Sequence, residues 1–465
     1  MAIEVDMMKK VPVSEQDPEV RAKNFDEVCL GYNEEEARAE STRCLQCKNP
    51  KCVEGCPVRI DIPGFIAKLK EGDNAGAYEI IGEASSLPAV CGRVCPQESQ
   101  CEGQCIRGIK GEPVSIGKLE RFTADWAREH GIKPVKKAHS KGRKVAVVGA
   151  GPSGLTCAGD LARMGYDVTI FEALHKAGGV LVYGIPEFRL PKDEVVEKEI
   201  ENVKALGVEI KTDYIIGRSE TVDELMDRQG FSAIYLASGA GLPMFMHIPG
   251  EQALGVYSAN EYLTRANLMK AYRDDYDTPI NKGKKTVVVG GGNVAMDAAR
   301  TALRLGSDVT IVYRRSEKEL PARVEEVHHA KEEGIEFALL TNPVEILEDE
   351  EGLVRGIRVI KMELGEPDAS GRRRPVEIPG SEYEIECDTV IMALGTTPNP
   401  LISGTTEGLE TNKKKCIVTD EDTGATSRPG VFAGGDCATG AATVILAMGA
   451  GRRAAKGIDD YLNGK

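Results

Sequence analysis

The stretch that most constrains this chain is Lys144 to Gly154, with the sequence KVAVVGAGPSG. Its apolar residues read as a buried strand, and three glycines at G-x-G-x-x-G spacing lead into an apolar run of helical period. Strand, turn and helix in this order are the context that a dinucleotide-binding fingerprint requires. Gly149 would form the tight turn, Gly151 would let a pyrophosphate approach the backbone, and Gly154 would let helix and strand pack closely. An ordinary glycine turn in an α/β unit is the alternative.

A second strand, Val168 to Phe171, ends on Glu172. An acid about 20 residues beyond the first glycine can accept hydrogen bonds from ribose hydroxyls. The pyrophosphate would then lie on the free N–H groups at the start of the helix. We therefore predict a doubly wound α/β domain built around this stretch.

A second fingerprint follows in the middle of the chain. Thr286 to Val289 reads as a strand, and GGGNVAMDAAR places Gly290 and Gly292 in the fingerprint positions, with Asn293 and Val294 opening a helix. This pattern predicts a second dinucleotide-binding domain.

The strand after the second fingerprint, Val309 to Tyr313, ends on Arg314 and Arg315 instead of an acid. A carboxylate at this place would bind the 2′-hydroxyl of NAD, whereas an arginine accommodates the 2′-phosphate of NADP. Paired guanidinium groups offer charge-assisted, forked hydrogen bonds to phosphate. We predict NADPH rather than NADH, with two solvated arginines at a strand end as the alternative.

The cysteines are unevenly distributed, and nine of the thirteen lie in the first 105 residues. Eight of these nine form two dense groups: Cys44, Cys47, Cys52 and Cys56, then Cys91, Cys95, Cys101 and Cys105. Dense thiolates with Cys-Pro endings are typical of ferredoxin-type iron–sulfur motifs. No histidine stands among them, which favours two [4Fe–4S] clusters over two structural zinc sites. We interpret the ninth, Cys29, as a small buried hydrophobe.

Two further stretches would complete a flavin site. In AGGVLVYGIPEFRLPK, Gly179 and its neighbours would let backbone lie against a large flat ligand, and Arg189 would either place a positive charge near the flavin or pair at the surface. Near the C-terminus, VFAGGD ends on Gly435 and Asp436. Asp436 could hold a ribityl hydroxyl, while the helix beginning near Thr443 would direct its free N–H groups at the flavin.

Length and charge limit the function classes. A chain of 465 residues predicts two or three domains, and a net charge of −14 argues against nucleic-acid binding. The opening MAIEVDMMKK lacks the apolar segment of a signal peptide, and no run of 18 apolar residues predicts a membrane span. We therefore expect a cytoplasmic protein with no membrane contact, in which thiols stay reduced.

The predicted fold class is α/β, with a helical two-cluster iron–sulfur domain followed by two doubly wound dinucleotide-binding domains, the second inserted in the first. The expected limits are 1–140 for the iron–sulfur domain, 141–250 plus 388–465 for the FAD-binding domain, and 251–387 for the NADPH-binding domain. The Lys-rich stretch 131–144 would be a linker, or else a docking patch for an acidic redox carrier. We expect helices over Ile62 to Ile81 and Leu119 to Ala127, and antiparallel strands over 343–387.

The cysteine groups, YGIPEFRLPK, VYRRSEKELPAR and GGDCATGAATV together resemble the glutamate synthase small-subunit family over nearly the whole chain. That family includes the β-subunit of bacterial NADPH glutamate synthase and the large subunit of NADH-dependent ferredoxin:NADP+ oxidoreductase. The opening VPVSEQDPEVRAKNFDEVCLGY and LPAVCGRVCPQE look most similar to the latter type.

The resemblance implies an oxidoreductase subunit that exchanges hydride with NADP(H) at FAD. It implies that single electrons pass through the clusters to or from ferredoxin or an NAD-binding flavoprotein subunit, as in an electron-bifurcating transhydrogenase. The alternatives are the NADPH-oxidising small subunit of glutamate synthase, whose partner is the large subunit, and a non-catalytic metal-binding assembly module. No CxxxxC stands beside the first fingerprint, where Cys157 is alone, so dithiol chemistry is not expected. We assign no catalytic acid or base, because the cofactors carry the hydride chemistry.

The resemblance also implies ligand sets. One cluster would lie on Cys44, Cys47, Cys52 and Cys105, and the other on Cys56, Cys95, Cys101 and Glu120, with Cys91 free. FAD would lie on Gly149, Gly151, Gly154, Glu172, Gly179 and Asp436, and NADPH on Gly290, Gly292, Asn293, Arg314 and Arg315. The alternative for the second cluster is an exposed Glu120, with Cys91 as the fourth ligand.

Overall fold

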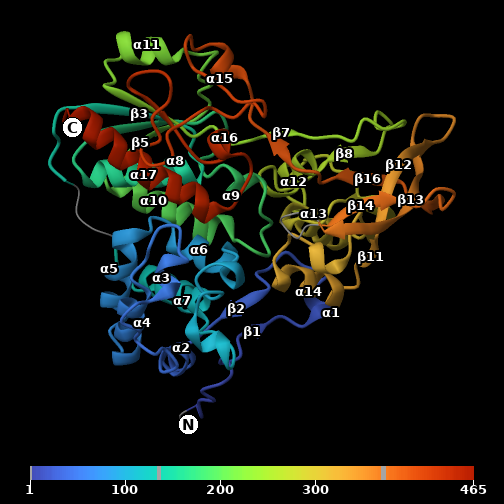
Figure 1. Ribbon diagram of the computed structural model, residues 1–465, viewed down its shortest axis with the longest axis horizontal. Helices are drawn as coiled ribbons and strands as arrows, with labels where there is room; N and C mark the ends of the chain where they lie inside the picture. The colour runs from blue at the N-terminus through green and yellow to red at the C-terminus, as the bar shows by residue number, and fades with distance from the viewer. Residues whose placement is uncertain (1–2, 134–137, 368–372, 465) are drawn as a thin grey trace.

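The computed structural model describes residues 3–133, 138–367 and 373–464, and Figure 1 shows three regions. An N-terminal helical region lies below the first α/β domain, and the second α/β domain lies beside them. Within the described residues, no helix is both long and apolar enough to cross a membrane. Residues 134–137 of the expected linker lie outside the described part of the chain.

The N-terminal region consists of short helices around the cysteines. Its helices are α2 (Glu34–Ser41), α3 (Lys51–Glu54), α4 (Ile62–Glu71), α5 (Asn74–Ala84), α6 (Pro88–Val94) and α7 (Ile116–Glu129). Two helices replace the single one expected over Ile62 to Ile81. Gly72 ends α4 in the left-handed conformation, and the side chain of Asp73 caps the start of α5.

An extended arm precedes these helices and reaches the second α/β domain (Figure 1). It contains β1 (Ser14–Glu15), α1 (Pro18–Arg21) and β2 (Cys29–Gly31), and β1 pairs with β2 in antiparallel fashion. Cys29 is partly exposed, with its Sγ 3.4 Å from the Nζ of Lys118, so the expectation of a buried hydrophobe is wrong.

The first α/β domain has a five-stranded parallel sheet in the order β18-β6-β3-β4-β5. Its strands are β3 (Lys144–Val148), β4 (Asp167–Phe171), β5 (Glu209–Lys211), β6 (Ala233–Leu236) and β18 (Val431–Ala433). The helices of this domain are α8 (Pro152–Arg163), α9 (Val180–Tyr183), α10 (Glu197–Ala205), α11 (Val222–Asp227), α15 (Leu401–Gly404), α16 (Asp436–Thr439) and α17 (Val444–Leu462). From the central strand β3 the chain continues outward through β4 and β5. It then crosses to β6 on the other side of β3, as in other doubly wound nucleotide-binding folds.

The second α/β domain repeats this plan, in the sheet order β11-β10-β9-β16-β8. Its strands are β8 (Val256–Ser258), β9 (Lys285–Val289), β10 (Asp308–Tyr313), β11 (Glu336–Leu339) and β16 (Thr389–Met392). Its helices are α12 (Ala259–Asn267), α13 (Asn293–Arg304) and α14 (Val324–Glu332). Because β16 pairs with β9 and β8, the residues of this strand belong to the second sheet and not to the first domain expected from residue 388 onward.

Two crossings join the domains. β7 (Leu242–Pro243) leaves the first domain, β17 (Thr396–Thr397) returns to it, and the two strands pair side by side. The antiparallel strands expected over 343–387 are present as β12 (Thr341–Glu348), β13 (Val354–Pro367), β14 (Arg373–Glu377) and β15 (Tyr383–Glu386).

The main hydrophobic core is shared by the helical region and the first α/β domain. Phe65 and Ile81 of the helices belong to the same buried cluster as Leu155 of α8 and Ile445 of α17. The second α/β domain has a separate core around α13. The cysteine region and the first fingerprint are therefore parts of one packed body.

Candidate functional site: two cysteine cradles and two dinucleotide loops

The first fingerprint has the backbone geometry that its glycines predict. Gly149 has φ +104°, and a Cβ there would lie 2.4 Å from the carbonyl oxygen of Ala237. A Cβ on Gly154 would lie 1.9 Å from the oxygen of Gly149, so α8 can approach β3 only with glycine at this position. Beside Gly151 the nearest atom is the Cα of Gly179, 4.0 Å away, which leaves its backbone approachable by a ligand.

Glu172 is buried at the end of β4 and holds the fingerprint loop. Its Oε2 accepts a hydrogen bond of 2.7 Å from the N–H of Ala150, and its Oε1 accepts one of 2.9 Å from Leu174. Burial raises the pKa of this carboxyl group, against the opposing effect of these N–H groups. Each carboxylate oxygen still has a lone pair for a ribose hydroxyl.

The C-terminal stretch that contains Gly435 and Asp436 lies next to the first fingerprint. Gly435 has φ +70°, and a Cβ there would lie 2.9 Å from the Cβ of Ser153 in α8. Burial raises the pKa of Asp436 to about 6. Burial also raises the pKa of Tyr183 to about 12, and both Asp436 and Glu172 add to this rise. Asp436 and Glu172 are thus both near enough to Tyr183 to act on its charge, and Thr443 caps α17.

Arg189 is bound by two carboxylates of the second α/β domain. Its Nη1 is 2.6 Å from Asp297 of α13, and its Nε is 2.8 Å from Glu326 of α14. Its side chain is 6% exposed, so the surface-pairing alternative is wrong. The two carboxylates bind it in the interface between the α/β domains, and its role beside the flavin stays a prediction.

The second fingerprint repeats the geometry of the first. Gly290 has φ +143°, and a Cβ there would lie 2.4 Å from the oxygen of Ala393. Gly292 caps α13, and Asn293 and the half-exposed Val294 begin the helix, so the free N–H groups of its first turn face the loop. Arg314 is exposed and Arg315 is partly buried, and neither forms an ion pair with any residue that the structure describes. Both are available for an anionic ligand.

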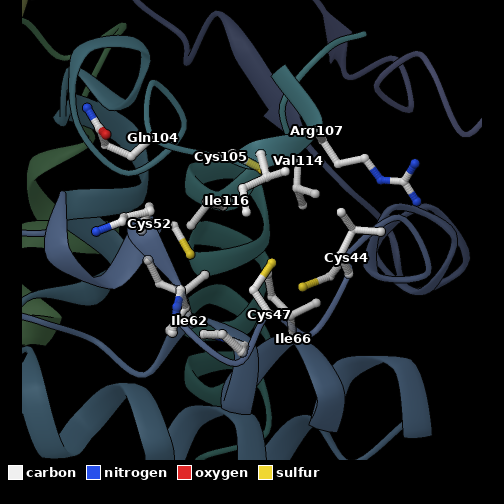
Figure 2. Close-up of a pocket in the computed structure, with 15 residues that line it drawn as sticks. Cys44, Cys47, Cys52, Ile62, Ile66, Gln104, Cys105, Arg107, Val114 and Ile116 are labelled. Atoms are coloured by element: carbon white, nitrogen blue, oxygen red, sulfur yellow. The ribbon is translucent and has the colours of Figure 1, made fainter. Parts of the chain in front are cut away.

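The first cysteine cradle is a pocket that opens to the protein surface (Figure 2). Cys44, Cys47, Cys52 and Cys105 all line it, in agreement with the grouping implied by the family resemblance. Burial raises the pKa of Cys52 to about 11, and Cys105 and Cys44 add to the rise. Four mutually close thiols are a ligand set that fits a [4Fe–4S] cluster, which stabilises them as thiolates.

The second cradle is more deeply buried. Cys56, Cys95, Cys101 and Glu120 are each less than 10% exposed. Burial raises the pKa of Cys56 to about 11, and Glu120 and Cys95 contribute to the rise, so these groups are neighbours. Burial also raises the pKa of Glu120 to about 8, and its Oε1 has no hydrogen-bond partner among the described residues. A buried acceptor without a donor fits a metal ligand.

Cys91 lies beside the second cradle. It is fully buried, with its Sγ 3.4 Å from the Sδ of Met448 in α17. The alternative ligand set required an exposed Glu120, and the burial of Glu120 contradicts that part of it. Cys157 is buried inside α8, and all thirteen cysteines are free thiols.

Comparisons with known proteins agree with this construction. Residues 21–132 match the family model described as dihydropyrimidine dehydrogenase domain II, 4Fe–4S cluster, and residues 143–451 match the pyridine nucleotide-disulphide oxidoreductase model. The small chain of NADPH glutamate synthase from Escherichia coli is 37% identical, over 98% of both chains. The β-subunit of the NADP+-dependent formate dehydrogenase of Moorella thermoacetica is 41% identical over 88% of this chain, which spans only 60% of that protein. FprA of Mycobacterium tuberculosis shares the fold, with a TM-score of 0.59 at 20% identity, over 69% of this chain and 85% of its own.

Fold, site and family matches together define an oxidoreductase that binds FAD and NADP(H) and carries a [4Fe–4S] domain. The zinc alternative and the non-catalytic assembly module are therefore set aside. The chain belongs to the glutamate synthase small-subunit family.

Proposed function

We propose that this chain is the NADP(H)-binding subunit of a larger redox complex, in which two [4Fe–4S] clusters carry electrons between a flavin site and the protein surface. The observation that carries the proposal is the position of the two cradles relative to α17. The N-terminus of α17 lies at the flavin stretch, and a Cβ on Gly449 of the same helix would lie 3.0 Å from the oxygen of Pro57, next to Cys56. The second cradle is thus adjacent to the flavin helix.

The first cradle would hold the outer cluster, which is the one nearer to the protein surface. Its four cysteines are all partly exposed, and its rim contains Leu45 at 50% and Ile106 at 42% exposure. Ile109, in the same 3₁₀ segment as Ile106, is 77% exposed. An apolar rim on an exposed metal cradle is a surface that a redox partner would cover.

The residues of the chain bind and align the cofactors. When bound, NADPH and FAD would supply the hydride transfer, and the clusters would supply transfer of one electron each. The backbone N–H groups of α8 and α13 would hold the two pyrophosphates, with Arg314 and Arg315 on the 2′-phosphate. Cys44, Cys47, Cys52 and Cys105 would hold the outer cluster, and Cys56, Cys95, Cys101 and Glu120 the inner one.

Among family members we favour the large subunit of an electron-bifurcating transhydrogenase, with an NAD-binding flavoprotein and ferredoxin as partners in the cytoplasm. The support is the opening arm, whose sequence resembles that type. The second candidate is the electron-supplying small subunit of glutamate synthase, supported by relatives that match over the full chain.

Anaerobic reduction tests the core of the proposal. NADPH added to the purified chain should bleach flavin absorbance and generate EPR signals from two reduced clusters. With glutamine and 2-oxoglutarate, the chain alone should form no glutamate. Flavin reduction without any cluster signal would contradict electron transfer from the flavin to the clusters.

Affinity purification separates the two candidates. A tagged chain that recovers a second flavoprotein supports the transhydrogenase, whereas a large amidotransferase supports glutamate synthase. Ile109→Asp should slow ferredoxin reduction several-fold. Leu254→Asp, at a similarly exposed position in the second α/β domain, should not slow it.

A further inference from the structure

Arg323 joins the second fingerprint to the iron–sulfur region. Its backbone N–H donates a 2.9 Å hydrogen bond to Oδ1 of Asn293, and the preceding Ala322 donates one of 3.2 Å to the oxygen of Gly291. The segment before α14 is therefore bound directly to the loop that would receive the coenzyme pyrophosphate.

The side chain of Arg323 points the other way, into the N-terminal region. It is 5% exposed, with Nη1 3.0 Å from the oxygen of Arg93 and Nη2 3.1 Å from Oε1 of Gln97. Glu325 lies 2.7 Å from Nη2 and balances the charge. Because Glu325 neutralises the guanidinium, Arg323 would act on Gln97 through its position and not through its charge.

Gln97 organises the ligand loop of the second cradle. It stands between Cys95 and Cys101 in the sequence, and its Nε2 donates to the carbonyl oxygens of Cys91 and Gly92, both at 3.3 Å. The backbone carbonyl oxygen of Gln97 accepts hydrogen bonds from the N–H groups of Glu102 and Gly103. A displacement of Gln97 would therefore move the backbone on both sides of Cys95.

The same side chain touches the helix that carries Glu120. A Cβ on Gly117, one turn before Glu120 in α7, would lie 2.3 Å from Nε2 of Gln97. Gln97 is consequently packed between α6 and α7, the two helices that place a thiol and a carboxylate at the second cradle.

We propose that Arg323 is a positioning residue that couples occupancy of the NADP(H) loop to the reduction potential of the inner cluster. The inference rests on the proposed coenzyme and cluster sites. Two short sets of hydrogen bonds connect the sites: the N–H groups of Ala322 and Arg323 donate to Gly291 and Asn293, and the buried side chain of Arg323 donates to Gln97. Coupling of this kind is reciprocal, so cluster reduction changes nucleotide affinity by the same factor that nucleotide binding changes cluster reduction.

The probe is 2′,5′-ADP, which has both phosphate groups of the coenzyme half but no nicotinamide and so accepts no electrons. EPR-monitored redox titration of the holoprotein, with and without saturating 2′,5′-ADP, measures the potential of each cluster. We expect the inner cluster to shift and the outer cluster, an internal reference, to stay unchanged. A fivefold change in affinity corresponds to about 40 mV for a one-electron couple.

Arg323→Lys tests the residue itself. Lysine keeps the charge but cannot form the fork to Gln97 and the Arg93 carbonyl group, so the shift should disappear while calorimetry still detects 2′,5′-ADP binding. Arg228→Lys, at the exposed position that caps the C-terminus of α11, should keep the full shift.

Three outcomes would overturn the inference. A normal shift in Arg323→Lys would remove Arg323 from the coupling. Binding of 2′,5′-ADP to the wild-type protein without any shift would overturn the coupling and leave the proposed function intact. Absence of 2′,5′-ADP binding would overturn the coenzyme site and the inference together.

Discussion

At the scale of single residues, the structure distinguishes side chains that are free to bind from side chains already used by the fold. Arg314 and Arg315 have no ion-pair partners among the described residues, whereas Arg189 is bound by two carboxylates. Both kinds of arginine look alike in the sequence. The difference is set by residues more than a hundred positions away, such as Asp297.

Replacement of both Arg314 and Arg315 by glutamine should change coenzyme choice. Each charge-assisted contact to the 2′-phosphate contributes about 1.5–3 kcal/mol, so KM for NADPH should rise at least about tenfold. Steady-state dye reduction measures KM, and the values with NADH should change little. Equal losses with both coenzymes would indicate a folding defect and contradict the assignment.

The fourth ligand of the inner cluster can be tested by a pair of variants. Glu120→Ala should alter the EPR signal or lower the iron content of one cluster, because the unpaired Oε1 of Glu120 belongs to the second cradle. Cys91→Ala should leave both clusters intact, because the Cys91 thiol contacts Met448. The reverse pattern would assign the ligand to Cys91.

At the scale of elements, the strands of both fingerprints were predictable to within about one residue, because glycine spacing and strand period are local properties. The break between α4 and α5 could also have been found, from Gly72 and Asp73. The short arm strands were not predictable, because β1 and β2 are defined by pairing with each other and have no apolar period of their own. Which cysteines share a cradle was implied by the family resemblance and not by the spacing of the cysteines in the sequence.

The contact between α8 and α17 should be sensitive to one added methyl group. A Cβ on Gly451 would lie 2.4 Å from the oxygen of Ser153, so Gly451→Ala should destabilise the protein by about 1–3 kcal/mol and lower its FAD content. Gly82→Ala is the matched control, because nothing lies within 4 Å of its Cβ position in α5. That substitution should stabilise the helix by about 0.5–1 kcal/mol. Thermal melting and flavin absorbance measure both; equal effects would contradict the packing argument.

At the scale of the whole molecule, the carboxyl group of Glu199 is one of the contacts that join the first α/β domain to the iron–sulfur region. Glu199 of α10 accepts hydrogen bonds from the N–H groups of Ala89 and Val90 at the start of α6. Burial raises the pKa of Glu199 to about 8, against the opposing effect of these N–H groups. The folded protein therefore keeps a proton that an unfolded glutamic acid, with a pKa of about 4.3, releases.

This linkage predicts that stability falls as pH rises from about 4.3 to about 8, since the folded state binds the extra proton in that range. Between pH 6 and pH 8 the contribution is on the order of 2–3 kcal/mol. Glu199→Gln should lower the melting temperature less at pH 8 than at pH 6, while Glu201→Gln, on the exposed side of α10, should behave as wild type. An unchanged pH slope in Glu199→Gln would contradict the assignment.

The N-terminal arm has a consequence for biosynthesis. Arg21 of the arm is paired at 3.1 Å with Glu333, 312 residues later in the chain. At about 5–20 residues per second, a ribosome needs roughly 15–60 s to make that partner after it has made the arm. In the later part of that interval, once Glu120 has been made, the cysteine region is complete while its cover from α17, which is made last, is absent. Iron and sulfide should therefore reach the inner cradle most easily during translation, and delivery after α17 has folded should meet a closed inner cradle.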